Sequence, residues 1–187
     1  MLVDTPTLVL GGGRSVAIVD EAGLARRGVE LVRRRSGGGA VLLVPGHHEW
    51  IDVWVPRGTP ERHDDVGRGA DRLGGVLGGA LDRTRRGPAS IAPAPHPPTR
   101  WSSSVCFAGV GSGEVLIGGR KAVGVSQRRT RDWIRLQSLV HRRWDAATTF
   151  GLLRDAEAAA ASEWADRVVG IGDVDAVGAF AHALSDA

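Results

Sequence analysis

The sequence predicts one α/β domain with a mixed, mostly antiparallel β-sheet and helices packed against it. Three observations support this fold class. Short apolar runs fill the first half, a central segment has helical spacing, and a Gly-Gly pair separates two apolar runs. Strands and helices do not alternate in the βαβ rhythm of a doubly wound fold. A chain of 187 residues also has the length of a single domain with one core.

The N-terminal half contains most of the predicted strands. Each is rich in Val, Leu or Ile and ends near Gly or Pro, and together they cover 7–10, 15–19, 29–34, 40–44 and 49–56. The last of these alternates most regularly, with Trp50, Asp52 and Trp54 on one face and branched aliphatic residues on the other. It is therefore expected to be a sheet strand with one polar face. An apolar ligand slot and core packing explain the two tryptophans equally well.

A helix is predicted from Pro60 to the arginines at 85 and 86, because apolar residues at 66–81 recur at helical spacing. Pro60 precedes this segment and suits a first helical position, and several glycines weaken the helix. Residues 87–100 contain five prolines, so a surface loop that is neither helix nor strand is expected there.

A hairpin is predicted around Gly118-Gly119, a dipeptide suited to a tight turn. Its strands would cover 114–117 and 120–126, and 133–140 could add a third. The Ala-rich remainder, 146–184, is expected to be helical with a break around 170–173.

The composition argues against several classes of protein. The net charge is +3 and the pI is near 10.3, but acidic residues are interspersed among the arginines, which disfavours nucleic-acid binding. No apolar run approaches the ~18 residues of a membrane span, and the N-terminus lacks the pattern of a signal peptide. The single cysteine, Cys106, cannot form an internal disulfide. A cytoplasmic protein is expected.

Lys121 is conspicuous because every other member of the 24 basic residues is an arginine. In a sequence biased toward Arg, Ala, Gly and Val, a solvated lysine is readily replaced by arginine. Lysine offers a compact ammonium whose pKa can shift at a crowded site. Either a functional lysine or an accidental surface residue accounts for this observation.

Two other segments contain candidate chemistry. Three glycines at 37–39 follow three arginines, so main-chain N–H groups and guanidinium groups could meet a phosphate or carboxylate; a loose turn with solvated arginines is the alternative. Cys106 could be a thioester nucleophile or a small buried hydrophobe. The run His47-His48-Glu49 does not predict a metal site, because adjacent strand residues point to opposite faces. His141 is a conceivable base.

The segments RRRSGGGAV, SSVCF and GRKAVGVSQRR, in this order, resemble the lipoate–protein ligase and octanoyltransferase family, which shares its catalytic domain with biotin–protein ligases. The resemblance implies a sheet domain of the class II synthetase and biotinyl protein ligase type. Residues 1–187 would form one such catalytic domain without the usual N-terminal elements.

The resemblance also assigns the site. Cys106 and Lys121 would be catalytic, and no metal is implied for the thioester route. The substrate would be bound by residues of the two flanking motifs, namely Arg33, Arg34, Ser36, Gly37, Gly38, Gly39, Gly124 and Gln127.

Three functions are compatible with this resemblance. The SSVCF element favours an acyltransferase that takes an octanoyl group from acyl carrier protein onto Cys106 and passes it to a lysine of a lipoyl-domain protein. The first alternative is a ligase that activates lipoate or octanoate with ATP and Mg²⁺. The second is a non-catalytic protein that binds a lipoyl or acyl-carrier partner.

Overall fold

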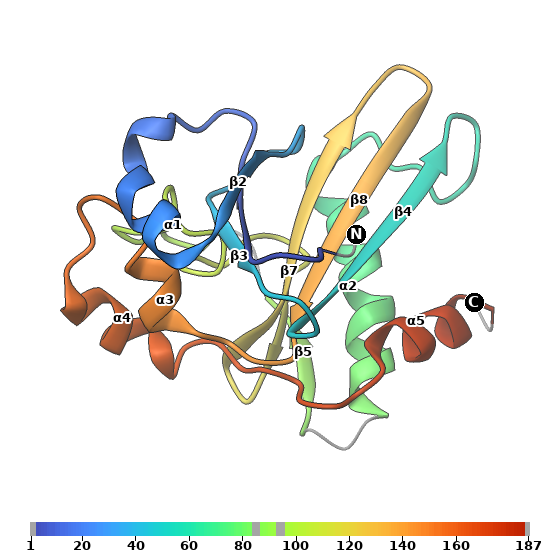
Figure 1. Ribbon diagram of the computed structural model, residues 1–187. Coiled ribbons are helices and arrows are strands. Elements are labelled where there is room, and N and C mark those ends of the chain that lie inside the picture. The colour runs from blue at the N-terminus through green and yellow to red at the C-terminus, as the bar shows by residue number, and fades with distance from the viewer. Residues whose placement is uncertain (1–2, 84–86, 93–95, 186–187) are drawn as a thin grey trace.

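The computed structural model describes residues 3–83, 87–92 and 96–185, and two β-sheets organise it (Figure 1). The smaller sheet has the order β2-β1-β3, with β1 (Thr7–Leu10), β2 (Glu30–Arg33) and β3 (Val41–Leu43). The larger sheet is antiparallel, with the order β4-β8-β7-β6-β5. Its strands are β4 (His48–Pro56), β5 (Ala89–Ile91), β6 (Val115–Ile117), β7 (Arg120–Arg129) and β8 (Trp133–His141).

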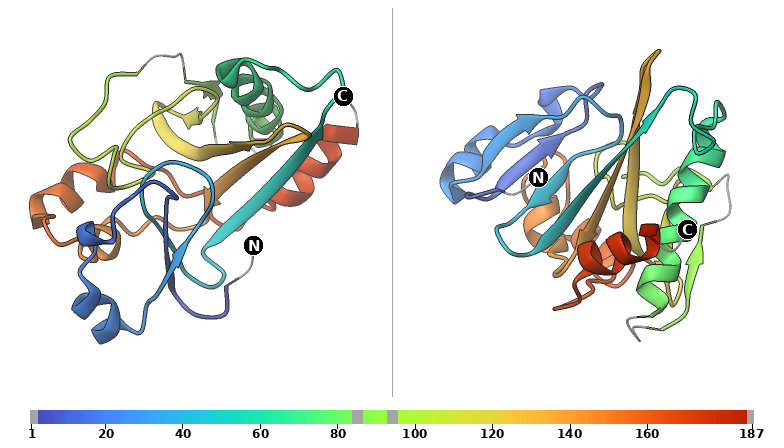
Figure 2. Two further views of the ribbon diagram at one scale, coloured as in Figure 1. Left: turned by 90° about the horizontal axis from the view of Figure 1, so that it is seen from above. Right: turned by 90° about the vertical axis from the view of Figure 1, so that its right-hand side faces the viewer.

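Each face of the large sheet is covered by different elements (Figure 2). The helices α2 (Val66–Asp82) and α5 (Ala176–Ser185) pack on one face, which we call the inner face. The small sheet covers part of the opposite, outer face. The helices α1 (Glu21–Arg27), α3 (Ala146–Phe150) and α4 (Ala158–Ala165) flank the small sheet and its loops. The mixed, mostly antiparallel α/β architecture is therefore confirmed. Among the described residues, no helix is long and apolar enough to cross a membrane.

Several predicted elements are confirmed. Strand β4 alternates as expected, and the backbone of Gly118 and Gly119 has φ of +57° and +75° in the turn between β6 and β7. Positive φ at both central residues is the geometry that favours glycine in a two-residue hairpin turn. The C-terminal region is helical with a break near Gly172, as its composition indicates.

Three predictions of secondary structure were wrong, and one helix was not predicted. Residues 15–19 form a short 3₁₀ helix, η1 (Val16–Ile18), because the side chain of Ser15 accepts a hydrogen bond from the amide of Ala17. Helix α1 was missed. Helix α2 begins at Val66 instead of Pro60, and Asp65 caps it by accepting from the amide of Arg68. The proline-rich loop contains strand β5, which pairs with β6; residues 93–95 of that loop lie outside the described residues.

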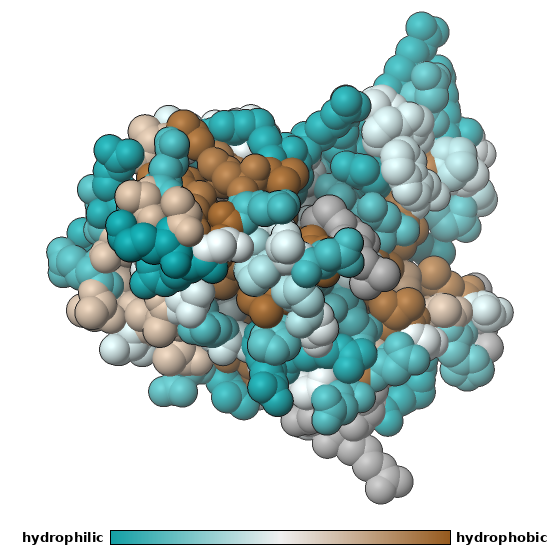
Figure 3. Space-filling view, viewed as in Figure 1, coloured by the Kyte–Doolittle hydropathy of each residue, from teal (hydrophilic) through white to brown (hydrophobic). Residues whose placement is uncertain are grey.

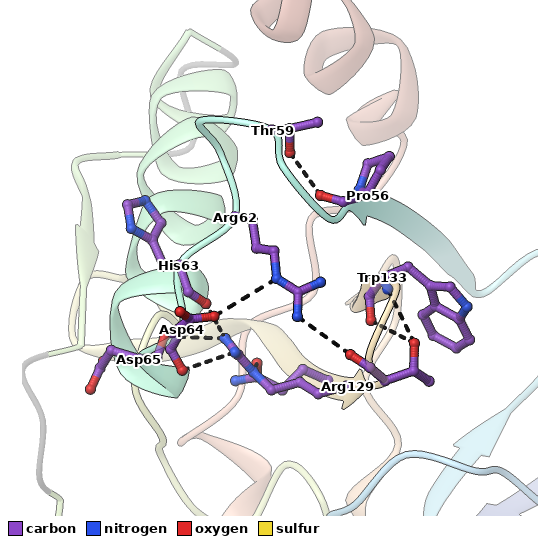
Figure 4. Close-up of polar contacts among 10 residues, drawn as sticks. Pro56, Thr59, Arg62, His63, Asp64, Asp65, Arg129 and Trp133 are labelled. Atoms are coloured by element: carbon purple, nitrogen blue, oxygen red, sulfur yellow. Dashed lines mark hydrogen bonds and ion pairs between the residues drawn. The ribbon is translucent and has the colours of Figure 1, made fainter.

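Two arginines hold the loop before α2 against the β7–β8 hairpin (Figure 4). Arg129 donates hydrogen bonds to the main-chain carbonyls of His63, Asp64 and Asp65. Arg62 donates to the carbonyl of Thr130 at 3.4 Å. Because these bonds join the loop to the end of β7, they fix the position of the strand that carries Lys121.

Candidate active site

Lys121 reaches the outer face through an irregularity in β7. Val115 pairs with Val123 and the next residue, Leu116, pairs with Lys121, so Ala122 is an extra residue at this step. A β-bulge of this kind changes the direction of a side chain. Ala122 and Val123 are both buried in the core beneath the sheet. Lys121 consequently lies against the ring of Phe107, with its Nζ 4.8 Å from the ring centroid.

The ammonium of Lys121 is buried and fully bonded. Its Nζ forms an ion pair with Oε2 of Glu114 at 2.6 Å, and it donates to the carbonyls of Cys106 at 2.9 Å and Gly109 at 2.8 Å. An ammonium has three N–H groups, so all of its donors have partners. The side chain is only 2% exposed. Lys121 is thus a fixed positive charge, and an accidental surface lysine is excluded.

Glu114 is a pocket residue and a partner of Lys121 that the sequence did not indicate. In addition to its ion pair with Lys121, its Oε2 accepts from the amide of Gly111 and its Oε1 accepts from the amide of Val125. Both carboxylate oxygens are therefore occupied, which is how a buried charge is tolerated. Glu114 joins the loop beneath the site to the middle of β7.

Cys106 is positioned by main-chain hydrogen bonds between its loop and Ala40, the residue before β3. Ala40 donates to the carbonyl of Ser104 at 2.7 Å, and the amide of Cys106 donates to the carbonyl of Ala40 at 2.8 Å. The side chain of Cys106 is partly exposed. Its Sγ has one polar neighbour among the described residues, Nη2 of Arg34 at 3.8 Å. The thiol is held in place by its backbone while its sulfur stays accessible.

The arginines of the glycine-rich loop bind main-chain carbonyls. Nη2 of Arg34, a buried side chain, donates to the carbonyls of Gly37 and Gly39. Nη1 of Arg33 donates to the carbonyls of Gly11, Gly12 and Arg14. Arg34 therefore stabilises the glycine-rich turn, whereas Arg33 joins the end of β2 to the loop at 11–14. Arg33 and Arg35 are exposed, so the alternative of a turn with solvated arginines holds for them and not for Arg34.

Close packing explains why glycine occupies position 39. A Cβ there would lie 2.7 Å from the main-chain carbon of Val105 and 2.8 Å from the amide nitrogen of Cys106. The glycine loop and the cysteine loop therefore touch backbone to backbone. Ser36 adds a second link, because its hydroxyl accepts from the hydroxyl of Ser126 on β7 at 3.2 Å.

The three predicted motifs converge on a pocket of about 390 Å³. Of the predicted site residues, it is lined by Gly37, Gly38, Gly39, Cys106, Lys121 and Gln127. Its other lining residues are Ser102, Gly109, Val110, Gly111, Glu114, Val125 and Ser126. Ser36 and Arg34 support this wall by hydrogen bonds to its lining residues, whereas Arg33 is outside the lining and bonds to the loop at 11–14. Gly124 lies behind the pocket, where a Cβ would approach the ring of Phe107 to 3.0 Å.

His141 lies behind Phe107, with ring centroids 4.5 Å apart. Burial first, and then the nearby charges of His48 and Lys121, lower the pKa of His141 to about 3. The imidazole is therefore neutral at neutral pH, and its side chain is buried outside the pocket lining. His141 is part of the support for Phe107 and Lys121.

Glu49 has a structural partner in place of a metal. It forms an ion pair with Arg142 at 2.6 Å and accepts from the amide of Val177 at the start of α5. No group of three potential metal-ligating side chains occurs in the part of the chain that the structure describes.

A partly exposed thiol beside a fixed ammonium, on the wall of a pocket, defines a site suited to acyl-group transfer. Residues 1–168 match the lipoyl protein ligase A/B catalytic domain, and the chain belongs to this family. It is accordingly an enzyme of protein lipoylation. No similar curated protein was found by sequence.

Solved structures with the same fold are lipoate–protein ligases. One is lipoate-protein ligase A bound with ATP, with a TM-score of 0.76 and 15% identity over 97% of this chain and 68% of that chain. Another is the bipartite lipoate protein ligase of Thermoplasma acidophilum, described with its E2 lipoyl domain. Its TM-score is 0.73 at 16% identity, over 97% of this chain and 67% of that one. A third, from the same organism, contains bound lipoic acid, with a TM-score of 0.73 and 16% identity over 97% and 68% of the two chains. These similarities show the fold.

Proposed function

We propose that this enzyme transfers an octanoyl or lipoyl group to a lysine of a lipoyl-domain protein through a thioester on Cys106. The observation that supports this proposal best is the accessible Sγ of Cys106 on the pocket wall, with the Lys121 ammonium 2.9 Å from the carbonyl of the same residue. A cysteine sulfur is the usual nucleophile of thioester exchange.

Two exchanges would complete the reaction. In the first, Sγ attacks the carbonyl carbon of an acyl thioester on acyl carrier protein. A new C–S bond forms, the old one breaks, and the carrier leaves as a thiol with the proton. In the second, the amine of the acceptor lysine attacks the Cys106 thioester, an amide forms, and the proton returns to Sγ. Neither step consumes ATP.

Lys121 would stabilise the negative charge that develops on the acyl oxygen during each attack. Because all three of its N–H groups are bonded, this oxygen must replace one present acceptor. The carbonyls of Cys106 and Gly109 are the neutral acceptors and are the ones expected to yield. The ion pair with Glu114 would keep the ammonium in place during the exchange.

An ATP-dependent lipoate ligase is the second candidate, favoured by the similar fold of a ligase bound with ATP. A magnesium nucleotide would require a carboxylate that can bind the metal. Glu114 is the acidic side chain among the described residues of the pocket lining, and hydrogen bonds occupy both of its oxygens. Among the described lining residues no carboxylate oxygen is left without a partner for Mg²⁺, and this supports the thioester route.

Intact-mass spectrometry tests the first candidate. Incubation with octanoyl-acyl carrier protein should add one octanoyl group to the wild-type chain and none to Cys106→Ala. Addition of an unmodified lipoyl domain should then discharge the adduct. If a folded wild-type protein forms no adduct, the proposed thioester is ruled out.

Pyrophosphate release tests the second candidate. A ligase would release pyrophosphate only with lipoate or octanoate, would retain this activity in Cys106→Ala, and would lose it in Lys121→Ala. A non-catalytic binding protein would show no turnover with any donor and would still bind its partner after both substitutions.

A further inference from the structure

The small sheet covers only part of the outer face of the large sheet, and the ends of β4, β7 and β8 that are at the top of Figure 1 are left uncovered. Trp50 and Leu139 are cross-strand partners that pack against it. Two residues further along β4, Asp52 pairs with Gln137, and two residues beyond that, Trp54 pairs with Arg135. Arg135 in turn pairs with Arg128 of β7. These last residues, together with Trp133, form what we call the upper sheet face.

Aromatic and guanidinium groups make up the upper sheet face. The rings of Trp54 and Trp133 lie with centroids 4.6 Å apart, and Trp54 is 53% exposed. Arg135 lies over the ring of Trp54 at 5.3 Å, and Arg128 over the ring of Trp133 at 5.9 Å. No ion pair of the described residues includes either arginine. The surface is therefore positively charged and carries two aromatic rings.

Figures 3 and 4 show that the upper sheet face is exposed. Figure 4 shows that the Trp133 ring points away from Arg62, Arg129 and the helix α2. Figure 3 shows that the arm formed by the upper ends of the strands projects from the body and is coloured teal and white, whereas brown gathers elsewhere. An exposed ridge of this kind is open to a partner protein.

The upper sheet face is directly beside the active-site pocket. Ser126 lines the pocket and lies on the same face of β7 as Arg128, two residues away. Two residues along a strand correspond to about 7 Å. A protein that rests on Trp54 and Arg128 can therefore place a side chain of its own at the mouth of the pocket.

We propose that the upper sheet face is the docking surface for the acceptor domain, and that this domain presents carboxylates near its target lysine. Tryptophan and arginine contribute most to binding energy at protein interfaces. Arginines that have no carboxylate partner in the described part of the chain can steer and orient an acidic partner. This inference rests on one part of the proposed function, namely that the acceptor is a lysine of a protein. The thioester and ligase routes both have such an acceptor.

Equilibrium binding of an unmodified lipoyl domain tests the proposal without any catalytic step. Titration followed by tryptophan fluorescence should show saturable binding that weakens with added salt. The variants Trp54→Ala and Arg128→Glu/Arg135→Glu should each raise the Kd by about tenfold or more. In the complete reaction, the same variants should raise the KM for the acceptor, with little change in kcat.

Arg154→Glu is the control for charge reversal at a single arginine, because Arg154 is exposed and lies after α3 outside the upper sheet face. It should bind the acceptor as the wild type does. An unchanged Kd in both surface variants would overturn the docking proposal. A rise in the KM for the carrier-bound donor alone would also overturn it, because the surface would then bind the donor. Self-association of the wild type that these variants abolish would overturn it too, because the surface would then bind a second copy of the chain. Failure of the proposed function has a different signature, namely acceptor binding without acyl transfer.

Discussion

Lys121 and Cys106 face the same pocket but are held in opposite ways. The Lys121 side chain is 2% exposed and has a partner for every N–H group. The Cys106 side chain is partly exposed, and its Sγ has one weak polar neighbour among the described residues. The difference separates two requirements of an acyl-transfer site. The charge must be fixed before the substrate arrives, whereas the nucleophile must stay free to react.

Substitutions should reveal this contrast as unequal effects on stability. Lys121 is connected through Glu114 to the loop at Gly111 and to Val125 of β7. Cys106 contributes its main chain to the fold, and its sulfur is the nucleophile of the proposed thioester route. Loss of the ammonium should therefore weaken the fold and the activity together, while loss of the sulfur should affect only activity.

Lys121→Met should have the largest effect. It leaves the carboxylate of Glu114 buried without its cation, which is expected to lower the free energy of unfolding by about 3–5 kcal/mol. Urea denaturation monitored by fluorescence measures this loss, and acyl transfer should fall below detection. The double variant Lys121→Met/Glu114→Gln should recover part of the stability and none of the activity. Equal stability of the single and double variants would contradict the ion-pair explanation.

The sequence predicted Lys121 and Cys106 as site residues, and both line the pocket, but it did not indicate Glu114. A hairpin with its turn at Gly118-Gly119 places Leu116 opposite Lys121, and regular pairing would direct Glu114 toward Val123. The bulge at Ala122 changes this register and brings the two charges together. Bulges are fixed by tertiary packing, so no local pattern in the sequence indicated the ion pair.

Secondary structure was predictable from the sequence where apolar and polar side chains repeat regularly. It was not predictable where one hydrogen bond or one strand pairing determines the local structure. The alternation of β4 and the spacing of α2 follow directly from their residues. The apolar run at 15–19 resembles a strand, but one hydrogen bond from Ala17 to Ser15 starts a 3₁₀ helix. Strand β5 lies among prolines and exists because β6 pairs with it. The arginines at 33 and 34 were expected at the substrate, yet they bind loop carbonyls, which only the folded backbone brings within reach.

Gly39→Ala should have the second largest effect, because it pushes the two loops apart at the nucleophile. The new methyl group would overlap the backbone of Val105 and Cys106, which cannot rotate away. A stability loss close to 3 kcal/mol is expected from such overpacking. Gly37→Ala is the control, since nothing lies within 4 Å of its Cβ position. If both variants unfold at the same urea concentration, backbone contact does not position Cys106.

Burial of the neutral His141 imidazole should make the stability of the fold fall in acid, because the proton binds to this histidine in the unfolded chain. Its folded pKa is about 3 and its unfolded value is near 6.5, so the unfolded state binds the proton more tightly. The contribution is fully present above pH 6.5 and is lost as the pH falls toward 3, reaching about 2 kcal/mol of lost stability at pH 5. Urea midpoints across this range should show the loss in wild type. His141→Phe should lack it, and the exposed His182→Asn should retain it. A wild-type slope unchanged in His141→Phe would assign the pH dependence to another group.

Cys106→Ala should have the smallest effect on the fold and a complete effect on the thioester. The sulfur is partly exposed and its contact with Arg34 is 3.8 Å long, so a stability change within about 1 kcal/mol is expected. The backbone bond from Cys106 to Ala40 is kept in the variant. Intact mass should show no octanoyl adduct, while the urea midpoint stays close to that of the wild type. A large loss of stability would mean that Cys106 is a packing residue, and the contrast with Lys121 would then no longer separate structure from chemistry.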